Sequence, residues 1–200
     1  MLNTKRAIID IGCGWGFWTK KCETYCSLIV GVDTRNIFYR TKNSKLHFIL
    51  ADGLKPPFKD EAFDAAISFE VIEHVQDDLN FLKEAARVLT KGAPILLTTP
   101  NKGRLANQIK KIIGKPTKYP LCLGIDHYTA KDAQGQWHFR EYFKNDIIEV
   151  FKKSGFDEIK TKGLSLGLGT KGLLSFPHFL ERFARIWIVK AIKHMDYTSK

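Results

Sequence analysis

Three glycines stand at alternate positions, Gly12, Gly14 and Gly16, directly after the apolar stretch IIDI that contains Asp10. A glycine-rich turn after the first strand of a parallel sheet lets the backbone approach a ligand at the carboxyl edge of the sheet. The spacing is not the dinucleotide pattern GxGxxG, because Phe17 stands where the third glycine is needed, and the GK[ST] of a phosphate-binding loop is absent. An acid just before the turn would repel a pyrophosphate. The turn therefore predicts a site for a cofactor that carries positive charge.

The elements that position this turn alternate between strands and helices. Short apolar segments with helices between them indicate parallel pairing through right-handed crossovers. The expected strands are residues 7–11, 28–33, 46–51, 63–69, 93–100, 156–162 and 185–193, and the expected helices cover residues 17–26, 79–91, 105–113 and 144–154. A short helix is expected near residues 173–184. A competing interpretation makes residues 176–195 one amphipathic helix, but the β-branched residues Ile186, Ile188 and Val189 favour a buried strand.

A long connection separates the basic helix at 105–113 from the helix that begins near residue 144. Residues 114–137 contain prolines, glycines and several aromatic side chains. A loop of this length inside a compact domain is usually a lid or a linker, and its aromatic content favours a lid. We expect one domain over residues 1–200, with this lid-like insertion at about 114–137.

The glycine turn and the segments after it resemble a known family. DIGCGWG looks like motif I of the class I S-adenosylmethionine-dependent methyltransferases, and GVD and ADG resemble the segments that in this family supply the acids for the ribose hydroxyls and the adenine. The resemblance implies that S-adenosylmethionine is the cofactor. The residues that it assigns to cofactor binding are Asp10, Gly12, Cys13, Gly14, Gly16, Asp33, Thr34, Asp52, Gly53 and Phe69.

Two later segments resemble one subgroup of that family, which includes the ubiquinone-biosynthesis O-methyltransferases. They are SFEVIEHV, followed by LKEAARVLTKGAPILLTTPN, and HFREYFKNDIIEVFKKSGF. The resemblance implies a Rossmann-like, doubly wound α/β fold with a seven-stranded sheet, mostly parallel, whose last strand is antiparallel. Only about six residues precede the first expected strand, where such enzymes commonly have a helix or two. We therefore expect either an open cofactor site or coverage by the lid and the C-terminal segment.

Three residues are the candidates for a catalytic role. Glu70 ends the fourth expected strand at the switch point of the sheet, and the resemblance places His74 near the acceptor. His138 falls in the family-like HFREYF segment and is favoured over His127 as a base. Each could instead be a structural side chain. The four cysteines form no CxxC pair and have no histidine at finger-like spacing, so no metal site is expected.

The net charge of +11 lies almost entirely in the second half of the chain. Residues 1–100 hold 13 basic and 12 acidic side chains, and residues 101–200 hold 19 and 9. This excess of positive charge has two interpretations: binding of an anionic partner, or solubility of the protein surface. We expect a small, anionic or lipid-like methyl acceptor, with methylation at O or N. The alternatives are a non-catalytic cofactor-binding module that supports a partner chain, or an RNA acceptor bound through a basic cluster, which consists of Lys102, Arg104, Lys110, Lys111, Lys115 and Lys118.

No apolar run approaches the roughly 18 residues of a membrane span, and the N-terminus has no signal-peptide pattern. We therefore expect a cytoplasmic protein, with peripheral membrane contact left open.

Overall fold

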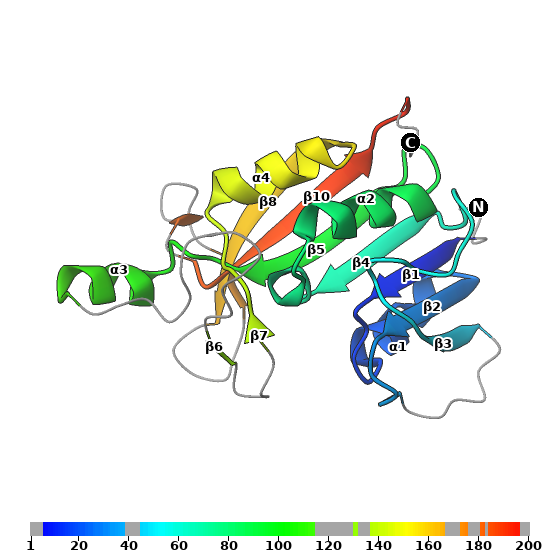
Figure 1. Ribbon diagram of the computed structural model, residues 1–200, viewed down its shortest axis with the longest axis horizontal. Helices are drawn as coiled ribbons and strands as arrows, with labels where there is room; N and C mark the ends of the chain where they lie inside the picture. Colours follow the sequence, from blue (N-terminus) through cyan, green and yellow to red (C-terminus); the bar gives the residue numbers. More distant parts are fainter. Residues whose placement is uncertain are drawn as a thin grey trace.

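The computed structural model describes residues 6–38, 45–114, 130–131, 137–166, 173–175, 181–182 and 184–196. Its main feature is one eight-stranded sheet with the strand order β3-β2-β1-β4-β5-β10-β8-β9 (Figure 1). The strands are β1 Ala7–Ile11, β2 Leu28–Asp33, β3 Leu46–Leu50, β4 Ala65–Phe69, β5 Pro94–Pro100, β8 Phe156–Leu166, β9 Leu173–Ser175 and β10 Ile186–Lys193. The five strands β1 to β5 are parallel, and β10 inserts antiparallel between β5 and β8.

The expected fold is confirmed, with one addition and one correction. The seven expected strands form a mixed sheet whose last strand is antiparallel, and residues 186–193 form a strand rather than a helix. The short helix expected near residues 173–184 is wrong at its start, because Leu173–Ser175 pairs antiparallel with residues 164–166 as the edge strand β9. By pairing with the free edge of β8, the segment Leu173–Ser175 forms hydrogen bonds for its backbone groups within the sheet. Residues 176–180 lie outside the described part of the chain.

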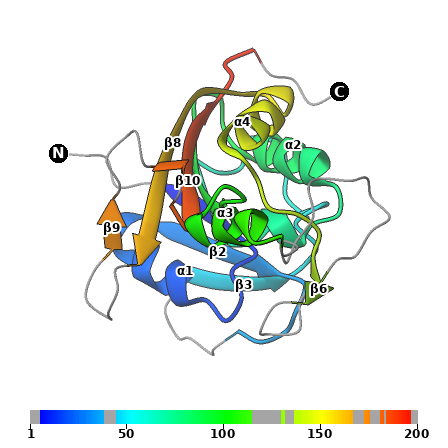
Figure 2. The ribbon, with the colours of Figure 1, turned by 90° about the vertical axis from the view of Figure 1, so that its left-hand side faces the viewer.

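Helices cover both faces of this sheet. The helices α2 (Asp78–Val88) and α4 (Lys144–Lys153) lie side by side on one face, and α1 (Phe17–Cys22) lies on the other (Figures 1 and 2). The main core forms under α2 and α4, where Phe81, Leu82 and Phe151 are buried against the strands. Two short 3₁₀ helices, η1 (Glu23–Tyr25) and η2 (Ile72–His74), follow α1 and β4. None of the helices in the described ranges has the length and apolar composition of a membrane span.

The carboxyl edge of the parallel strands is where functional side chains gather. The glycine turn follows β1, Asp33 ends β2, Asp52 follows β3 and Glu70 follows β4. From the same edge the helix α3 (Leu105–Ile112) extends after β5, as Figure 1 shows. The short strands β6 (Ala130–Lys131) and β7 (Trp137–His138) pair antiparallel. Most of the predicted lid, residues 115–129 and 132–136, lies outside the described residues, so the lid stays a prediction.

Candidate active site

The glycine turn is shaped by packing against the segment that follows β4. All three glycines have positive φ, +79° at Gly12, +56° at Gly14 and +92° at Gly16. The backbone N–H groups of Gly12 and Cys13 both donate to the carbonyl of Val32, at 2.8 and 2.9 Å. A Cβ at Gly12 would lie 2.4 Å from a methyl carbon of Val71. Gly12 is therefore required by a close approach within the protein as well as by its backbone conformation.

Asp33 ties the end of β2 to the glycine turn. Its carboxylate accepts from the backbone N–H of Gly14 at 2.8 Å and from the backbone N–H of Arg35 at 3.0 Å. The Arg35 side chain also donates to it, at 3.2 Å from Nε. Although Asp33 is only 7% exposed, it lines the cavity described below. A carboxylate offers about four acceptor positions, so one remains after these three bonds for a ligand hydroxyl.

Five of the ten residues assigned to cofactor binding lie outside the cavity wall, namely Asp10, Cys13, Gly14, Gly16 and Phe69. Asp10 is 2% exposed and accepts from the Thr19 hydroxyl at 2.6 Å, and burial raises the pKa of its carboxyl to about 7. Cys13 is buried against β2, where its sulfur lies 2.8 Å from the position of a Cβ on Gly31, and burial raises the pKa of this thiol. Gly16 forms the N-terminal cap of α1, and the ring of Phe69 packs edge-on against Trp18 at 5.2 Å. Asp10 and Cys13 are therefore buried in the fold beside the turn and do not face the cavity.

A cavity of about 530 Å³ opens at the carboxyl edge. The structure brings five of the predicted cofactor residues together at the β1–β3 end of this cavity, namely Gly12, Asp33, Thr34, Asp52 and Gly53. Apolar side chains complete its wall there, namely Ile11, Val32, Ala51, Leu54, Val75 and Phe81. An apolar wall with two carboxylates fits an adenosine group, whose ring is flat and whose ribose donates hydroxyls. Gly14 lies beside the cavity through its bond to Asp33.

The other end of the same cavity holds candidate catalytic residues. Glu70, His74 and Phe139 line it, together with Val71 and Gln76. Glu70 has a φ of +55°, a conformation that non-glycine residues rarely adopt, and its backbone N–H donates to the Thr98 carbonyl at 3.0 Å. Such strained positions are enriched at functional sites. Burial raises the pKa of the Glu70 carboxyl.

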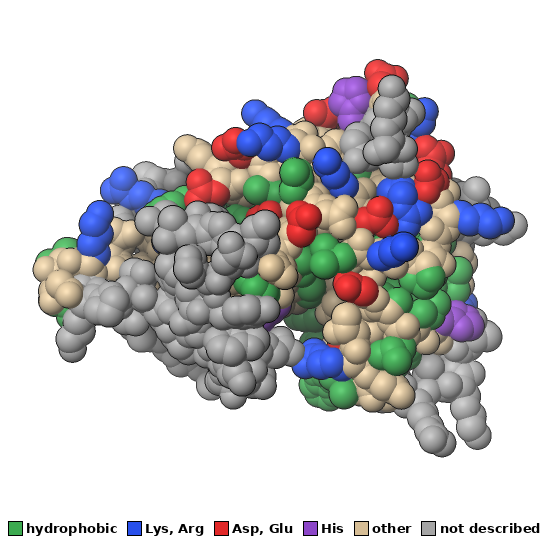
Figure 3. Space-filling view, viewed as in Figure 1, with side chains coloured by type: hydrophobic (Ala, Val, Ile, Leu, Met, Phe, Trp, Pro, Cys, Tyr) green, Lys and Arg blue, Asp and Glu red, His purple; other side chains and the backbone are tan. Residues whose placement is uncertain are grey.

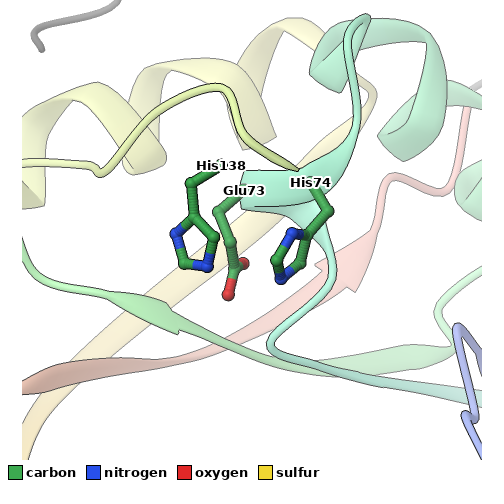
Figure 4. A group of neighbouring side chains, drawn as sticks. All are labelled: Glu73, His74 and His138. Carbon is green, nitrogen blue, oxygen red and sulfur yellow. The ribbon is translucent and has the colours of Figure 1, made fainter. Parts of the chain in front are cut away.

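A second feature at this end is the cluster of Glu73, His74 and His138, whose side chains converge in Figure 4. Glu73 is fully buried, its Oε2 accepts from the Thr99 hydroxyl at 3.1 Å, and burial raises its pKa well above the ordinary value. The rings of His74 and His138 meet edge to face with centroids 4.3 Å apart. The sequence predicts the two histidines as separate candidates and does not single out Glu73. The only part of this cluster visible in the sequence is the adjacent pair Glu73-His74, because His138 comes from a distant segment.

Several residues of the site have no sequence signal of their own. Val71 and Phe139 enter the cavity wall because they adjoin Glu70 and His138 in the chain. The backbone N–H of Phe139 donates to the carbonyl of Glu73 at 2.8 Å, which binds the start of the HFREYF segment to η2. This backbone bond, together with the ring contact between His74 and His138, joins two parts of the site that are far apart in sequence.

Comparisons with known proteins agree with the fold and this arrangement. Residues 9–97 match the family model described as a methyltransferase domain. The chain is 37% identical over 139 residues to norajmaline N-methyltransferase of Rauvolfia serpentina, covering 60% of this chain and 48% of that protein. It is 26% identical over 169 residues to the ubiquinone biosynthesis O-methyltransferase of Pelagibacter ubique, covering 80% of this chain and 65% of that protein. The chain spans only about half the length of several curated relatives that it matches, between 37% and 57%.

Solved structures show the same fold. A methyltransferase in complex with the Trm112 methyltransferase activator of Haloferax volcanii matches with a TM-score of 0.69 and 14% identity, covering 100% of this chain and 87% of that chain. A glycine turn after β1, acids after β2 and β3, and a mixed sheet with an antiparallel last strand form an α/β methyltransferase fold. The family match covers residues 9–97, under half of the chain, and together with these relatives it supports a class I S-adenosylmethionine-dependent methyltransferase. The matches include N- and O-methyltransferases, so they support the class rather than the ubiquinone-type subgroup.

Proposed function

We propose that this chain transfers a methyl group from S-adenosylmethionine to an O or N atom of a small, anionic or lipid-like acceptor. The observation that carries the proposal is the shared cavity, which has Asp33 and Asp52 at one end and Glu70 and His74 at the other. A cofactor held by the first pair would direct its reactive end toward the second. The acceptor would then enter beside Glu70, His74 and Phe139.

The residues of the cavity have different tasks in this reaction. When bound, S-adenosylmethionine supplies a methyl group that is already activated by its positively charged sulfur. The chain has to align the acceptor with that methyl group and exclude water, and such alignment contributes up to about 7–11 kcal/mol to lowering the barrier. Asp33 and Asp52 orient the adenosine end, and Val71 and Phe139 close the wall. Where the acceptor carries a proton, His74 or His138 serves as the base.

The side chains of the basic cluster favour a small acceptor over RNA. Lys102 is only 5% exposed, and Arg104 Nη2 lies 2.7 Å from a carboxylate oxygen of the buried Glu141. Two of the six basic residues are thus committed inside the fold, while the side chains of Lys110, Lys115 and Lys118 lie outside the described part. On the face shown in Figure 3, Lys and Arg side chains alternate with Asp and Glu over α2 and α4. A phosphate-binding surface would need a single-sign patch.

Transfer of a labelled methyl group tests the proposal directly. The protein is incubated with methyl-labelled S-adenosylmethionine and a fractionated cell extract, and label is counted in RNA, protein and small molecules. We expect label in the small-molecule fraction and its loss in Asp33→Ala. Label in RNA would show that the acceptor is RNA and not a small molecule. Cofactor binding without label in any fraction would indicate a non-catalytic binding module. Failure to bind S-adenosylmethionine or S-adenosylhomocysteine by calorimetry would refute the proposal as a whole.

A further inference from the structure

Glu73, His74 and His138 have the donor chemistry of a metal site. Each offers one ligand atom, and these atoms all lie within 4.8 Å of one another. Two imidazoles and one carboxylate are a donor set that suits a divalent transition-metal ion and leaves coordination positions open. We propose that this cluster binds such an ion, of the Zn²⁺ or Mn²⁺ type, at the acceptor end of the cavity. Local Cys and His spacing does not predict this site, because its ligands come from two distant segments.

The Glu73 carboxylate is held as metal ligands usually are. It is fully buried, and one oxygen accepts from the Thr99 hydroxyl while the other, Oε1, has no hydrogen-bond partner among the described residues. Figure 4 shows this carboxylate directed between the two imidazoles. A second group that orients a ligating carboxylate is a regular feature of metal sites. A buried carboxylate oxygen without a donor is costly unless a cation or a proton satisfies it.

The backbone already brings the three ligating residues together before any ion is bound. Glu73 and His74 are neighbours on η2, and His138 ends β7. The hydrogen bond from Phe139 N–H to the Glu73 carbonyl, at 2.8 Å, fixes the two segments together. Ligands at about 2.1 Å around a tetrahedral ion are roughly 3.4 Å apart, so the ligand atoms need to close by at most about 1.4 Å from the limit of 4.8 Å. Small rotations of the two imidazoles would achieve that.

The position of the cluster also narrows the class of acceptor, an inference that rests on the proposed function. His74 lines the cavity beside Glu70, whereas Glu73 and His138 are buried behind it. An ion held by these three ligands would have its open coordination position toward the cavity, where an acceptor oxygen could bind. Coordination lowers the pKa of a bound hydroxyl. The acceptor is then an alcohol or phenol, and the ion takes over from His74 and His138 the task of promoting loss of its proton. The proton passes to solvent, the oxygen forms the bond to the methyl carbon, and the electron pair of the broken carbon–sulfur bond stays on sulfur.

Metal binding can be measured apart from methyl transfer. The purified protein, without cofactor or acceptor, is dialysed against Zn²⁺ and separately titrated with Co²⁺, whose absorption bands report coordination by nitrogen and oxygen. We expect one equivalent of metal in the wild type and at least 10-fold weaker binding in His74→Gln, Glu73→Gln and His138→Gln. His47→Gln, which changes an exposed histidine on β3, is the matched control. Circular dichroism checks that each variant is folded.

The outcomes separate this inference from the proposed function. Binding that is equal in His74→Gln and His47→Gln, or a wild type that retains no metal, would overturn the metal site. Stoichiometric metal binding with no binding of S-adenosylmethionine would keep the site and refute the proposed function. If the site is confirmed and the labelled product carries its methyl group on nitrogen, the assignment of an oxygen acceptor is wrong.

Discussion

Replacing Gly12 with alanine tests whether the glycine turn is held by Val71. The new Cβ would lie 2.4 and 2.6 Å from the two methyl carbons of Val71, well inside van der Waals contact. The overpacking costs about 1–3 kcal/mol, and an alanine at a φ of +79° costs about 1–2 kcal/mol more. Gly12→Ala should therefore lower the free energy of unfolding by about 2–5 kcal/mol.

Gly14→Ala is the matched control, because Gly14 also has positive φ but a Cβ there meets only an Arg35 nitrogen at 4.0 Å. It should cost only the backbone term of about 1–2 kcal/mol. Both variants are compared with the wild type by urea denaturation followed by circular dichroism. The variant Val71→Ala removes the two closest carbons. It should therefore lower the free energy of unfolding less in the Gly12→Ala background than in the wild-type background. Equal losses for Gly12→Ala and Gly14→Ala, or additive effects of Gly12→Ala and Val71→Ala, would refute the packing explanation.

Three further predictions concern single side chains. Asp33→Ala should weaken binding of S-adenosylmethionine in calorimetry by about 1.5–3 kcal/mol, since charge-assisted hydrogen bonds are lost; unchanged affinity would remove Asp33 from the cofactor site. The folded-state pKa of Asp10, about 7, lies above its ordinary value of 3.8, so the contribution of Asp10 to stability is most favourable below pH 4 and falls as the pH rises to about 7. Asp10→Asn, whose amide can still accept from Thr19, should exceed the wild type by on the order of 4 kcal/mol at pH 8 and match it near pH 4, in urea denaturation at both pH values. Arg87→Leu should lose about 1.5–3 kcal/mol, because the Arg87 guanidinium donates to two loop carbonyls and two carboxylates, whereas Lys83→Leu on the exposed side of α2 should change the free energy of unfolding little.

The strands, the main helices and the cofactor end of the site could be predicted from the sequence. Apolar runs of five to eight residues between turn signals indicate strands locally, and the order in which they alternate with helices restricts the topology. The glycine turn, Asp33 and Asp52 each follow a strand directly, so their shared edge follows from parallel pairing alone. The strand predicted at residues 185–193 is confirmed as Ile186–Lys193, because its β-branched residues suit a buried position between two partner strands.

What only the tertiary structure decided are the properties that depend on distant partners. The sequence alone does not show that Asp10, Cys13 and Lys102 are buried in the fold. The edge strand β9 exists because β8 offers it unpaired backbone groups. The cluster of Glu73, His74 and His138 forms where backbone and side-chain contacts join η2 and the start of α2 to the segment after β7. Local sequence patterns set backbone conformation and periodicity, whereas burial, pKa and the convergence of ligands come from contacts between segments that are far apart in the chain.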